Sequence, residues 1–282
     1  MVCRSRSWIN RYRQIAALTL AAMAIQLVAA YAALAQGNYQ ELPLSPDAMT
    51  LGRLSISAQH TVVNDMLSGA QPLQPETFSK FFNEMLFPLM TQSNPKTVGS
   101  KKIDPLVNDG GPANVRAKLK KDYINKATNS AAHKLLNEVT LAAMEKIATQ
   151  NYHPYVRANA VMTIAELNET DPNGPPWKPA QKTLLNLATS NDSAEVVRVP
   201  ALAGLVRQAQ SGLDADLRPN TITGMVNLLS RRDPSPTADR VANDWMCRHA
   251  IDVLSAIGDL GTNAAAVKAL TDTVDDANAS VA

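Results

Sequence analysis

The stretch Val197-Arg198-Val199-Pro200-Ala201-Leu202-Ala203-Gly204-Leu205 decides the fold of this 282-residue chain, because its spacing recurs. An aliphatic residue and an arginine precede an alanine by four and three positions, and an aliphatic residue follows it by four. The full pattern occurs twice, in Val156-Arg157-x-x-Ala160-x-x-x-Ile164 and Val197-Arg198-x-x-Ala201-x-x-x-Leu205, and a third copy without the arginine is Met246-Cys247-x-x-Ala250-x-x-x-Leu254. The alanines lie 41 and 49 residues apart, which is within or close to the period of two-helix repeats.

A second amphipathic stretch precedes each copy, so the repeating unit contains two helices. Apolar residues at three- and four-residue intervals predict these pairs: Ala131–Gln150 with Tyr155–Leu167, Lys178–Thr189 with Ala194–Gln210, and Asn220–Ser230 with Ala238–Gly258. Thr262–Val274 begins a fourth unit. The break at Asn151–Pro154 is short, so its two helices are expected to pack antiparallel as a hairpin.

The repeated motif resembles the second helix of HEAT-type repeats, which typically opens with Val-Arg and has a small residue three positions after the arginine. The resemblance implies an all-α fold, a right-handed α-solenoid of antiparallel helix hairpins of the HEAT or armadillo-like kind. Cys247 stands at the arginine position of the third copy and departs from the pattern. The resemblance covers residues 131–282, with units at about 131–170, 177–212 and 219–259, and an incomplete one at 262–282.

The same resemblance implies a structural role for three polar residues. In HEAT-type repeats an aspartate in the turn and the arginine of the second helix form a polar ladder between stacked units. Asp192, Arg157 and Arg198 occupy these positions here. They are therefore expected to hold the units together rather than to contact a partner.

A stack of such hairpins offers a long continuous surface and few deep pockets, which favours binding of a protein or peptide over catalysis. We therefore expect a non-catalytic scaffold without a cofactor or a metal. The exposed side of the second helices is the expected contact face, and its predicted residues are Asn159, Thr163, Glu166, Arg207, Asp252 and Ser255.

An enzyme built on the repeats, or an accessory subunit of an exported enzyme, is the alternative. It would require a cleft that gathers His153 and His249 with carboxylates such as Asp252 or Glu166. The sequence contains no nucleophile elbow, phosphate-binding loop, dinucleotide fingerprint or HExxH helix. Trp177 and Trp245 are interpreted as packing anchors, with ligand stacking as the second interpretation.

Residues 1–35 have the layout of a secretory signal peptide. Basic residues without acidic ones precede an apolar run from Ile15 to Ala35, and small residues at Ala33 and Ala35 favour cleavage before Gln36. The alternative is an uncleaved N-terminal membrane anchor, since about 20 apolar residues span a bilayer. Both readings place the remainder outside the cytoplasm, in the periplasm or the extracellular space, as an exported bacterial protein.

Cleavage changes the charge of the working protein. The whole chain has 27 basic and 25 acidic residues, and loss of the four arginines of the leader leaves 23 against 25, a net charge of −2. A nucleic-acid binder normally shows a basic face, which this balance does not indicate. The mature chain keeps one cysteine, Cys247, so it cannot form an internal disulfide.

The flanks of the repeat region are less regular. Residues 36–130 are expected to form an irregular N-terminal cap region with helices at Ser57–Leu67, Thr77–Met90 and Ala113–Ala127, joined by a loop-like link over 94–112. The Phe-rich stripe of the second of these is interpreted as buried packing, with an exposed docking stripe as the alternative. At the other end, residues 275–281 resemble the turn before another repeat helix, so we expect a truncated or frameshifted version of a longer protein, with a partner that covers this end as the alternative.

Overall fold

The computed structural model describes residues 39–93, 96–98, 101–103, 111–170, 174–230, 240–259, 261 and 264–274. The chain divides into two compact units, Met1–Tyr39 and Gln40–Ala282, and the description below concerns the second. The described part is mostly helical, which confirms the all-α prediction. The proposed leader, with Ala33, Ala35 and Gln36, lies outside the described residues.

Short helices form the N-terminal part of the Gln40–Ala282 unit. The helices are α2 (Leu51–Ser55), α3 (Ala58–Ser68), α4 (Pro75–Phe81), the π-helix η2 (Phe82–Leu86), α5 (Phe87–Met90), α6 (Pro112–Lys118) and the π-helix η3 (Leu119–Tyr123), with 3-10 turns η1 (Pro46–Ala48) and η4 (Ile124–Lys126). Helix α3 begins where Ser57 accepts a hydrogen bond from the His60 N–H, as an N-cap serine does. The sequence predicted this helix but not η1 or α2.

The link over 94–112 contains one element that the sequence did not predict. Strand β1 (Lys96–Val98) pairs antiparallel with β2 (Lys101–Ile103), with Thr97 opposite Lys102. The rest of the link up to residue 110 lies outside the described ranges.

An aromatic cluster forms the core of these short helices. Phe78, Phe81, Phe82 and Phe87 are at most 2% exposed, and the ring of the buried Tyr123 lies 5.3 Å from that of Phe82 in an edge-to-face arrangement. Such aromatic pairs stabilise a core beyond the area they bury. The interpretation of the phenylalanine stripe as buried packing is confirmed, and an exposed docking stripe is wrong.

The repeat region consists of the helices that the periodicity predicts, with ends shifted by a few residues. They are α7 (Ser130–Thr149), α8 (Pro154–Ala165), α9 (Ala180–Thr189), α10 (Glu195–Ser211), α11 (Arg218–Ser230), α12 (Arg240–Ile257) and α13 (Ala265–Val274). Asn129 caps α7 by accepting hydrogen bonds from the Ala131 and Ala132 N–H groups. Each apolar stripe in the sequence therefore corresponds to a buried helix face.

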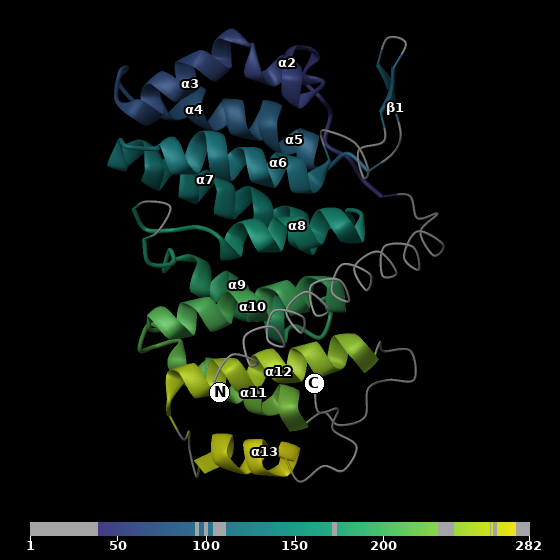
Figure 1. Cartoon of the computed structure of the whole chain (residues 1–282), viewed down its shortest axis with the longest axis vertical. Coiled ribbons are helices and arrows are strands. Elements are labelled where there is room, and N and C mark those ends of the chain that lie inside the picture. The colour runs from purple at the N-terminus through teal and green to yellow at the C-terminus, as the bar shows by residue number, and fades with distance from the viewer. Residues whose placement is uncertain are drawn as a thin grey trace, which may run out of the picture. The chain divides into compact units, whose positions relative to one another are not determined.

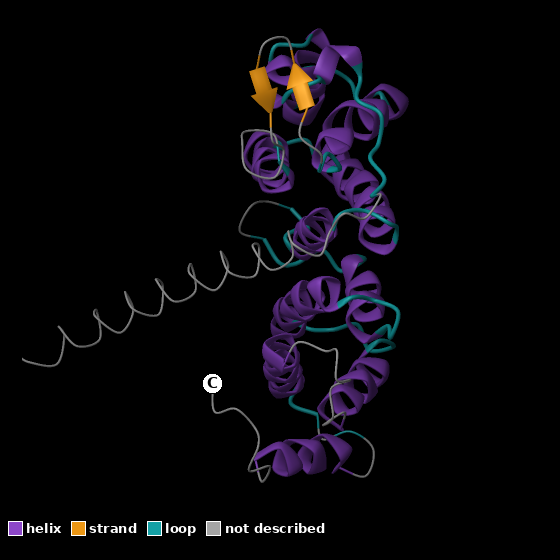
Figure 2. Cartoon of the chain, turned by 90° about the vertical axis from the view of Figure 1, so that its right-hand side faces the viewer, coloured by secondary structure: helices purple, strands orange, loops and turns teal. Residues whose placement is uncertain are grey.

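The second helices of the pairs follow one another in space. Helix α10 packs against both α8 and α12, and α11 packs against both α9 and α13. Figure 1 shows α8, α10 and α12 in this order along the unit, and Figure 2 shows the same succession from the side. The N-terminal helices join the first pair, because α3, α4 and η2 pack on α7 while α6 packs on α8.

Two glycines mark the closest approaches between helices. A Cβ at Gly204 of α10 would lie 2.8 Å from the Ala165 Cβ and 3.1 Å from both terminal methyl groups of Leu184. A Cβ at Gly224 of α11 would lie 2.7 Å from a methyl group of Thr189 in α9. The 2.8 and 2.7 Å distances are shorter than non-bonded carbon atoms normally approach, so a larger residue at either glycine would push the helices apart.

At Gly204, tight packing and helix propensity predict opposite changes in the free energy of unfolding. We expect Gly204→Val to lower the free energy of unfolding by about 1–3 kcal/mol, because the side chain has no room. Helix propensity alone would raise stability, since glycine is the poorer helix former. Urea unfolding followed by circular dichroism measures the change.

Ala203→Val is the matched control, because Ala203 is the exposed neighbour of Gly204 on the same helix. It should cost less than about 1 kcal/mol, the difference in propensity between the two residues. A Gly204→Val protein at least as stable as the parent would contradict the tight packing of α10 against α8.

Candidate functional site

The second helices share one side on which every residue keeps some solvent exposure, although Ala165 at its edge also contacts α10. Counting from the register alanines Ala160, Ala201 and Ala250, the positions at −5, −2, +2 and +5 are all at least partly exposed. At about 100° per residue these positions fall together on the side of each helix opposite its alanine. In the order α8, α10, α12 the rows are Tyr155, Val196 and Trp245; Ala158, Val199 and Arg248; Met162, Ala203 and Asp252; Ala165, Val206 and Ser255. We call these twelve residues the outward face.

The outward face is largely apolar. Its residues on α8 and α10 carry no charge, and the largest are Tyr155, Met162 and the valines Val196, Val199 and Val206, which also pack partly against the core. On α12 the exposed aromatic Trp245 continues the surface at 36% exposure. A partly exposed apolar surface that continues into an exposed aromatic residue is a candidate binding site.

Two of the predicted contact residues are not on this face. Asn159 is completely buried and Thr163 is 2% exposed. The amide of Asn159 donates to the Tyr155 carbonyl at 2.9 Å, and the Thr163 hydroxyl donates to the Asn159 carbonyl at 2.8 Å. The prediction of these two as surface contacts is wrong, because the helix is rotated by one residue and the preceding residues, Ala158 and Met162, are the partly exposed ones.

Two further predicted contact residues form polar interactions within the protein. Glu166 pairs with Arg116 of α6, with 2.7 Å between Oε1 and Nη1, and its other oxygen lies 3.6 Å from the Lys120 Nζ. Arg207 donates from Nη1 to the Ala165 carbonyl at 2.9 Å and the Leu167 carbonyl at 3.2 Å. Asp252 and Ser255, in contrast, lie on the outward face as predicted.

Arg207 belongs to a polar junction between the first two pairs. The Asn168 carbonyl, just after α8, accepts hydrogen bonds from the His133 ring Nε2 at 2.9 Å and the Asn137 amide at 2.7 Å. The Arg207 Nη2 donates to the Asn168 side-chain oxygen. Burial lowers the pKa of the Arg207 guanidinium and the nearby Glu166 opposes this shift, but an arginine stays charged at any physiological pH. The guanidinium thus satisfies backbone carbonyls at the C-terminal end of α8, where helices prefer a cation.

Two buried glutamines extend the junction along the connection to α9. The Gln208 amide donates to the Trp177 carbonyl at 3.1 Å, and the Gln181 amide donates to the Gln208 side-chain oxygen at 3.2 Å. Trp177 is 6% exposed, so its interpretation as a packing anchor is confirmed. The Asp214 N–H in turn donates to the Gln181 side-chain oxygen at 3.0 Å, which fixes the segment after α10.

The two arginines of the repeated motif donate hydrogen bonds to the first helix of their own helix pair. The Arg157 Nε donates to the Ala148 carbonyl at 2.8 Å, and the Arg198 Nε donates to the Ala188 carbonyl at 3.1 Å. Each arginine therefore closes the last turn of the preceding helix, which leaves carbonyls open. Asp192 is exposed, and its backbone N–H bonds to the Ser190 hydroxyl at 3.2 Å. A ladder of Asp192 with the arginines remains a prediction.

Helix α12 carries a group of interacting polar and aromatic side chains on or beside the outward face. The Arg248 guanidinium lies 5.5 Å from the Trp245 ring centre, and the His249 ring lies 5.8 Å from it. The His249 Nδ1 is 3.7 Å from an oxygen of Asp252. Burial and Arg248 lower the pKa of His249, against the opposing effect of Asp252. Trp245 is 36% exposed, so it packs less completely than the packing-anchor interpretation expects.

Of the four residues named for catalysis, His249 and Asp252 approach each other on α12, while His153 and Glu166 have other roles. His153 caps α8 by accepting a hydrogen bond from the Tyr155 N–H, burial lowers its pKa, and Glu166 is engaged by Arg116. Within the described ranges, no three His, Cys, Asp or Glu side chains come together as a metal site requires. Burial also raises the pKa of the Cys247 thiol, with Asp244 adding to the shift, so this thiol is a weak nucleophile.

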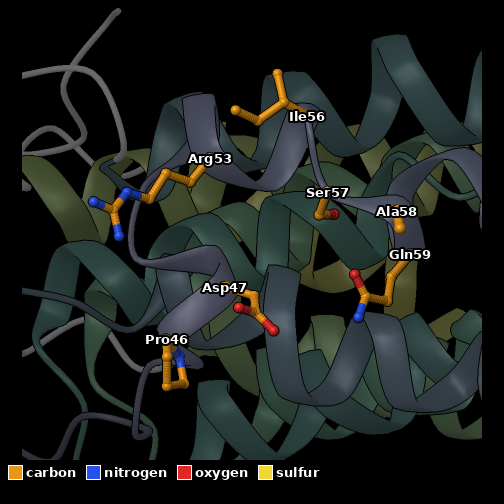
Figure 3. Close-up of a pocket in the computed structure, with 7 residues that line it drawn as sticks. All are labelled: Pro46, Asp47, Arg53, Ile56, Ser57, Ala58 and Gln59. Carbon is orange, nitrogen blue, oxygen red and sulfur yellow. The ribbon is translucent and has the colours of Figure 1, made fainter.

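A hollow of about 460 Å³ lies elsewhere, between η1 and the start of α3. Figure 3 shows Arg53 and Ile56 pointing to different sides rather than converging with Asp47. Ile56 is 85% exposed, so the hollow is open to solvent. A catalytic cleft requires convergent polar groups sheltered from water, which this hollow does not offer.

Comparison with known proteins adds no further assignment. No protein-family model matches the chain, and no curated protein or solved structure matches it either. None of the helices in the described part of the chain is long and apolar enough to cross a membrane.

The polar junction gives a second prediction about stability. We expect Arg207→Met to lower the free energy of unfolding by about 1–3 kcal/mol, because it leaves the partly buried oxygens of α8 and Asn168 without their donor. Arg218→Met, which removes an exposed arginine at the start of α11, serves as the control and should change stability by less than about 0.5 kcal/mol. Equal effects in urea unfolding would show that Arg207 does not fasten the two pairs.

Proposed function

We propose that this protein is an exported, non-catalytic scaffold whose HEAT-like helix pairs form a right-handed α-solenoid and bind a protein or peptide. One observation carries the proposal: the outward face extends over three successive helices, with partly exposed apolar side chains on α8 and α10 and the exposed Trp245 on α12. The succession of α8, α10 and α12 supports the solenoid arrangement. A continuous surface of this kind suits an extended partner better than a small molecule.

The chemistry of the outward face indicates the kind of partner. Tyr155, Met162 and Trp245 are residue types that dominate binding energy at protein interfaces. Arg248 holds its charge over the Trp245 ring, where it is placed to meet an acidic group at the border of the contact. We therefore propose a partner segment with apolar side chains along its length and a carboxylate toward α12.

The enzymatic alternative has less support. It needs His153, His249 and a carboxylate in one sheltered cleft, whereas His153 caps α8 and Glu166 pairs with α6. His249 and Asp252 approach each other on α12, but they are neighbours one turn apart on a single helix face. Such a pair is common on ordinary helix surfaces.

Export rests on the leader sequence and has a direct test. When the full chain is expressed in a secreting bacterium, we expect the exported protein to begin at Gln36, because signal peptidase recognises the small residues Ala33 and Ala35. Mass spectrometry of the intact protein from the envelope fraction measures this. A chain that keeps Met1 and stays in the membrane would contradict cleavage and support an uncleaved anchor.

The outward face is tested by partner capture with matched variants. The bait is the chain from Gln36 onward, and the test variant combines Tyr155→Ser, Val199→Ser and Trp245→Ser. We expect the proteins retained from the envelope fraction by the parent to be lost, because the variant removes the apolar contacts from all three helices.

The control variant changes exposed residues on first helices, Lys134→Ser and Glu138→Ser on α7, and should retain the same proteins. Circular dichroism confirms that both variants stay folded. Capture that is undiminished in the outward-face variant would refute the proposed site. Turnover of a substrate by the captured complex that depends on His153 would favour the enzymatic alternative.

A further inference from the structure

Residues 40–44, which we call the strap, are attached to helices that lie far away in the sequence. The Gln40 N–H donates to the Asn151 carbonyl, in the loop between α7 and α8, at 2.9 Å. The Leu42 N–H donates to the Thr91 hydroxyl oxygen, just after α5, at 2.9 Å. Both leucines of the strap are only partly buried against the core. Hydrogen bonds, rather than deep burial, therefore distinguish this attachment.

The backbone of Leu42 is bound at both of its polar groups. Besides the bond from its N–H, its carbonyl accepts a hydrogen bond from the Gln92 amide at 2.9 Å. The N–H and C=O of one extended residue point to the same side, where a neighbouring strand would pair with both. The buried side chains of Thr91 and Gln92 take the place of that strand. Sites that recognise extended peptides bind the main chain in the same way.

The residue before Leu42 adds a charge to the contact. The Ser93 N–H donates to the Glu41 Oε1 at 2.7 Å, and the Ser93 hydroxyl donates to the same oxygen at 3.2 Å. Hydrogen bonds to a carboxylate are about twice as strong as those between neutral groups. Successive side chains of an extended segment point to opposite sides. A carboxylate moved by one residue would therefore turn away from Ser93.

Two prolines prepare the strap for this site. Leu42 precedes Pro43 and Ser45 precedes Pro46, and a residue before proline is restricted to extended conformations. Ser45 accordingly has a φ of −64° and a ψ of 137°. A segment that is already extended loses less conformational freedom when it binds. The strap thus has the properties of a short peptide ligand.

We propose that Thr91, Gln92, Ser93 and the α7–α8 loop form a second binding site, the strap site. It accepts an extended partner segment in which a carboxylate, a leucine and a proline follow one another. The strap is the built-in competitor, because it has this chemistry and belongs to the same chain. With the proposed cleavage before Gln36 the strap lies near a chain end, so it can leave the site without unfolding a helix.

The strap site is separate from the outward face, so the two proposals fail independently. Its polar side chains follow α5, whereas the outward face lies on α8, α10 and α12. A variant that combines Val199→Ser and Trp245→Ser alters the outward face alone. It should leave binding at the strap site within about twofold of the parent, as expected of distant, independent positions.

The experiment supplies the strap as a separate peptide. A labelled peptide of residues 36–45 is titrated into the chain from Gln36 onward that carries Glu41→Gly and Leu42→Gly, which we call the open-strap variant. We expect saturable binding by fluorescence anisotropy, because the altered strap lacks the carboxylate and the leucine and glycine makes it costly to order. The unaltered chain should bind at least about tenfold more weakly, because its attached strap competes at an effective concentration of order millimolar.

A matched peptide tests the position of the carboxylate. It carries Gln40→Glu together with Glu41→Gln, so that composition and net charge are unchanged. We expect it to bind the open-strap variant about tenfold more weakly than the parent peptide, because the charge-assisted bonds from Ser93 are lost. Adding Thr91→Val to the open-strap variant should also weaken binding of the parent peptide, since the Leu42 N–H loses its acceptor.

A second measurement needs no altered chain. In isotope-labelled protein with its own strap, an excess of unlabelled peptide should speed hydrogen exchange at the Gln40 and Leu42 amides, because the strap is displaced. Nuclear magnetic resonance follows these amides one by one. Circular dichroism shows whether the open-strap variant is folded, and this exchange measurement decides the matter if it is not.

Four results would overturn the inference. They are no saturable binding to a folded open-strap variant, equal affinity for the two peptides, equal affinity of the unaltered and open-strap chains, and unchanged exchange of the strap amides at excess peptide. A parent protein that sediments as a dimer and becomes a monomer with Glu41→Gly and Leu42→Gly would also overturn it, since the strap of a second copy would then be the occupant.

Discussion

The close approach of α10 to α8 at Gly204 is the constraint on which the rest of the structure depends. With the Ala165 Cβ only 2.8 Å from the place of a Cβ at this position, the two helices touch at their smallest residues. Larger residues on either side then interlock, and the remaining contacts are set in register. The same principle acts between α11 and α9 at Gly224, so both series of helices are aligned by a small residue rather than by a large one.

Hydrogen bonds from side chains add to the stabilisation that close helix packing provides. Helix ends leave four carbonyls without partners, and this protein satisfies several of them with side chains from the next element. Arg157 and Arg198 do so within a pair, and Arg207 does so between pairs. Each of these donors fits only one arrangement of carbonyls. The hydrogen bonds therefore fix the relative position of neighbouring helices more precisely than apolar packing alone.

Much of the helical layout was predictable from the sequence, because burial of one helix side leaves a periodic apolar pattern. Every helix from α7 to α13 corresponds to such a pattern. The alignment of Ala160, Ala201 and Ala250 indicated which residues of the second helices occupy equivalent positions. The burial of the phenylalanines in α4, η2 and α5 followed from the same reasoning. The short turns η1 and α2 and the β1–β2 hairpin were missed because they are too brief to show a period.

The site was less predictable, because the rotation of a helix is decided by contacts that one sequence does not display. Asn159 and Thr163 are polar, yet they turn inward and bond to the carbonyls of their own helix. Their apolar neighbours Ala158 and Met162 face outward instead. Trp245 was expected to be buried because large aromatic rings usually pack in a core. In the structure it lies at the surface of α12 beside Arg248 and His249. Only the packing of α8 between α6, α7 and α10 settles which side is free.

The central claim is that α8, α10 and α12 lie side by side in that order, so that each pair shields its neighbours. Spin labels at the equivalent exposed positions Met162, Ala203 and Asp252, with Cys247→Ser to remove the native thiol of the mature chain, give the three distances directly by electron paramagnetic resonance. The account predicts that the 162–252 separation is the largest, close to twice the spacing of about 8–10 Å between packed helix axes, with 162–203 and 203–252 shorter and similar. Three equal separations, as in helices gathered around one closed centre, would contradict it.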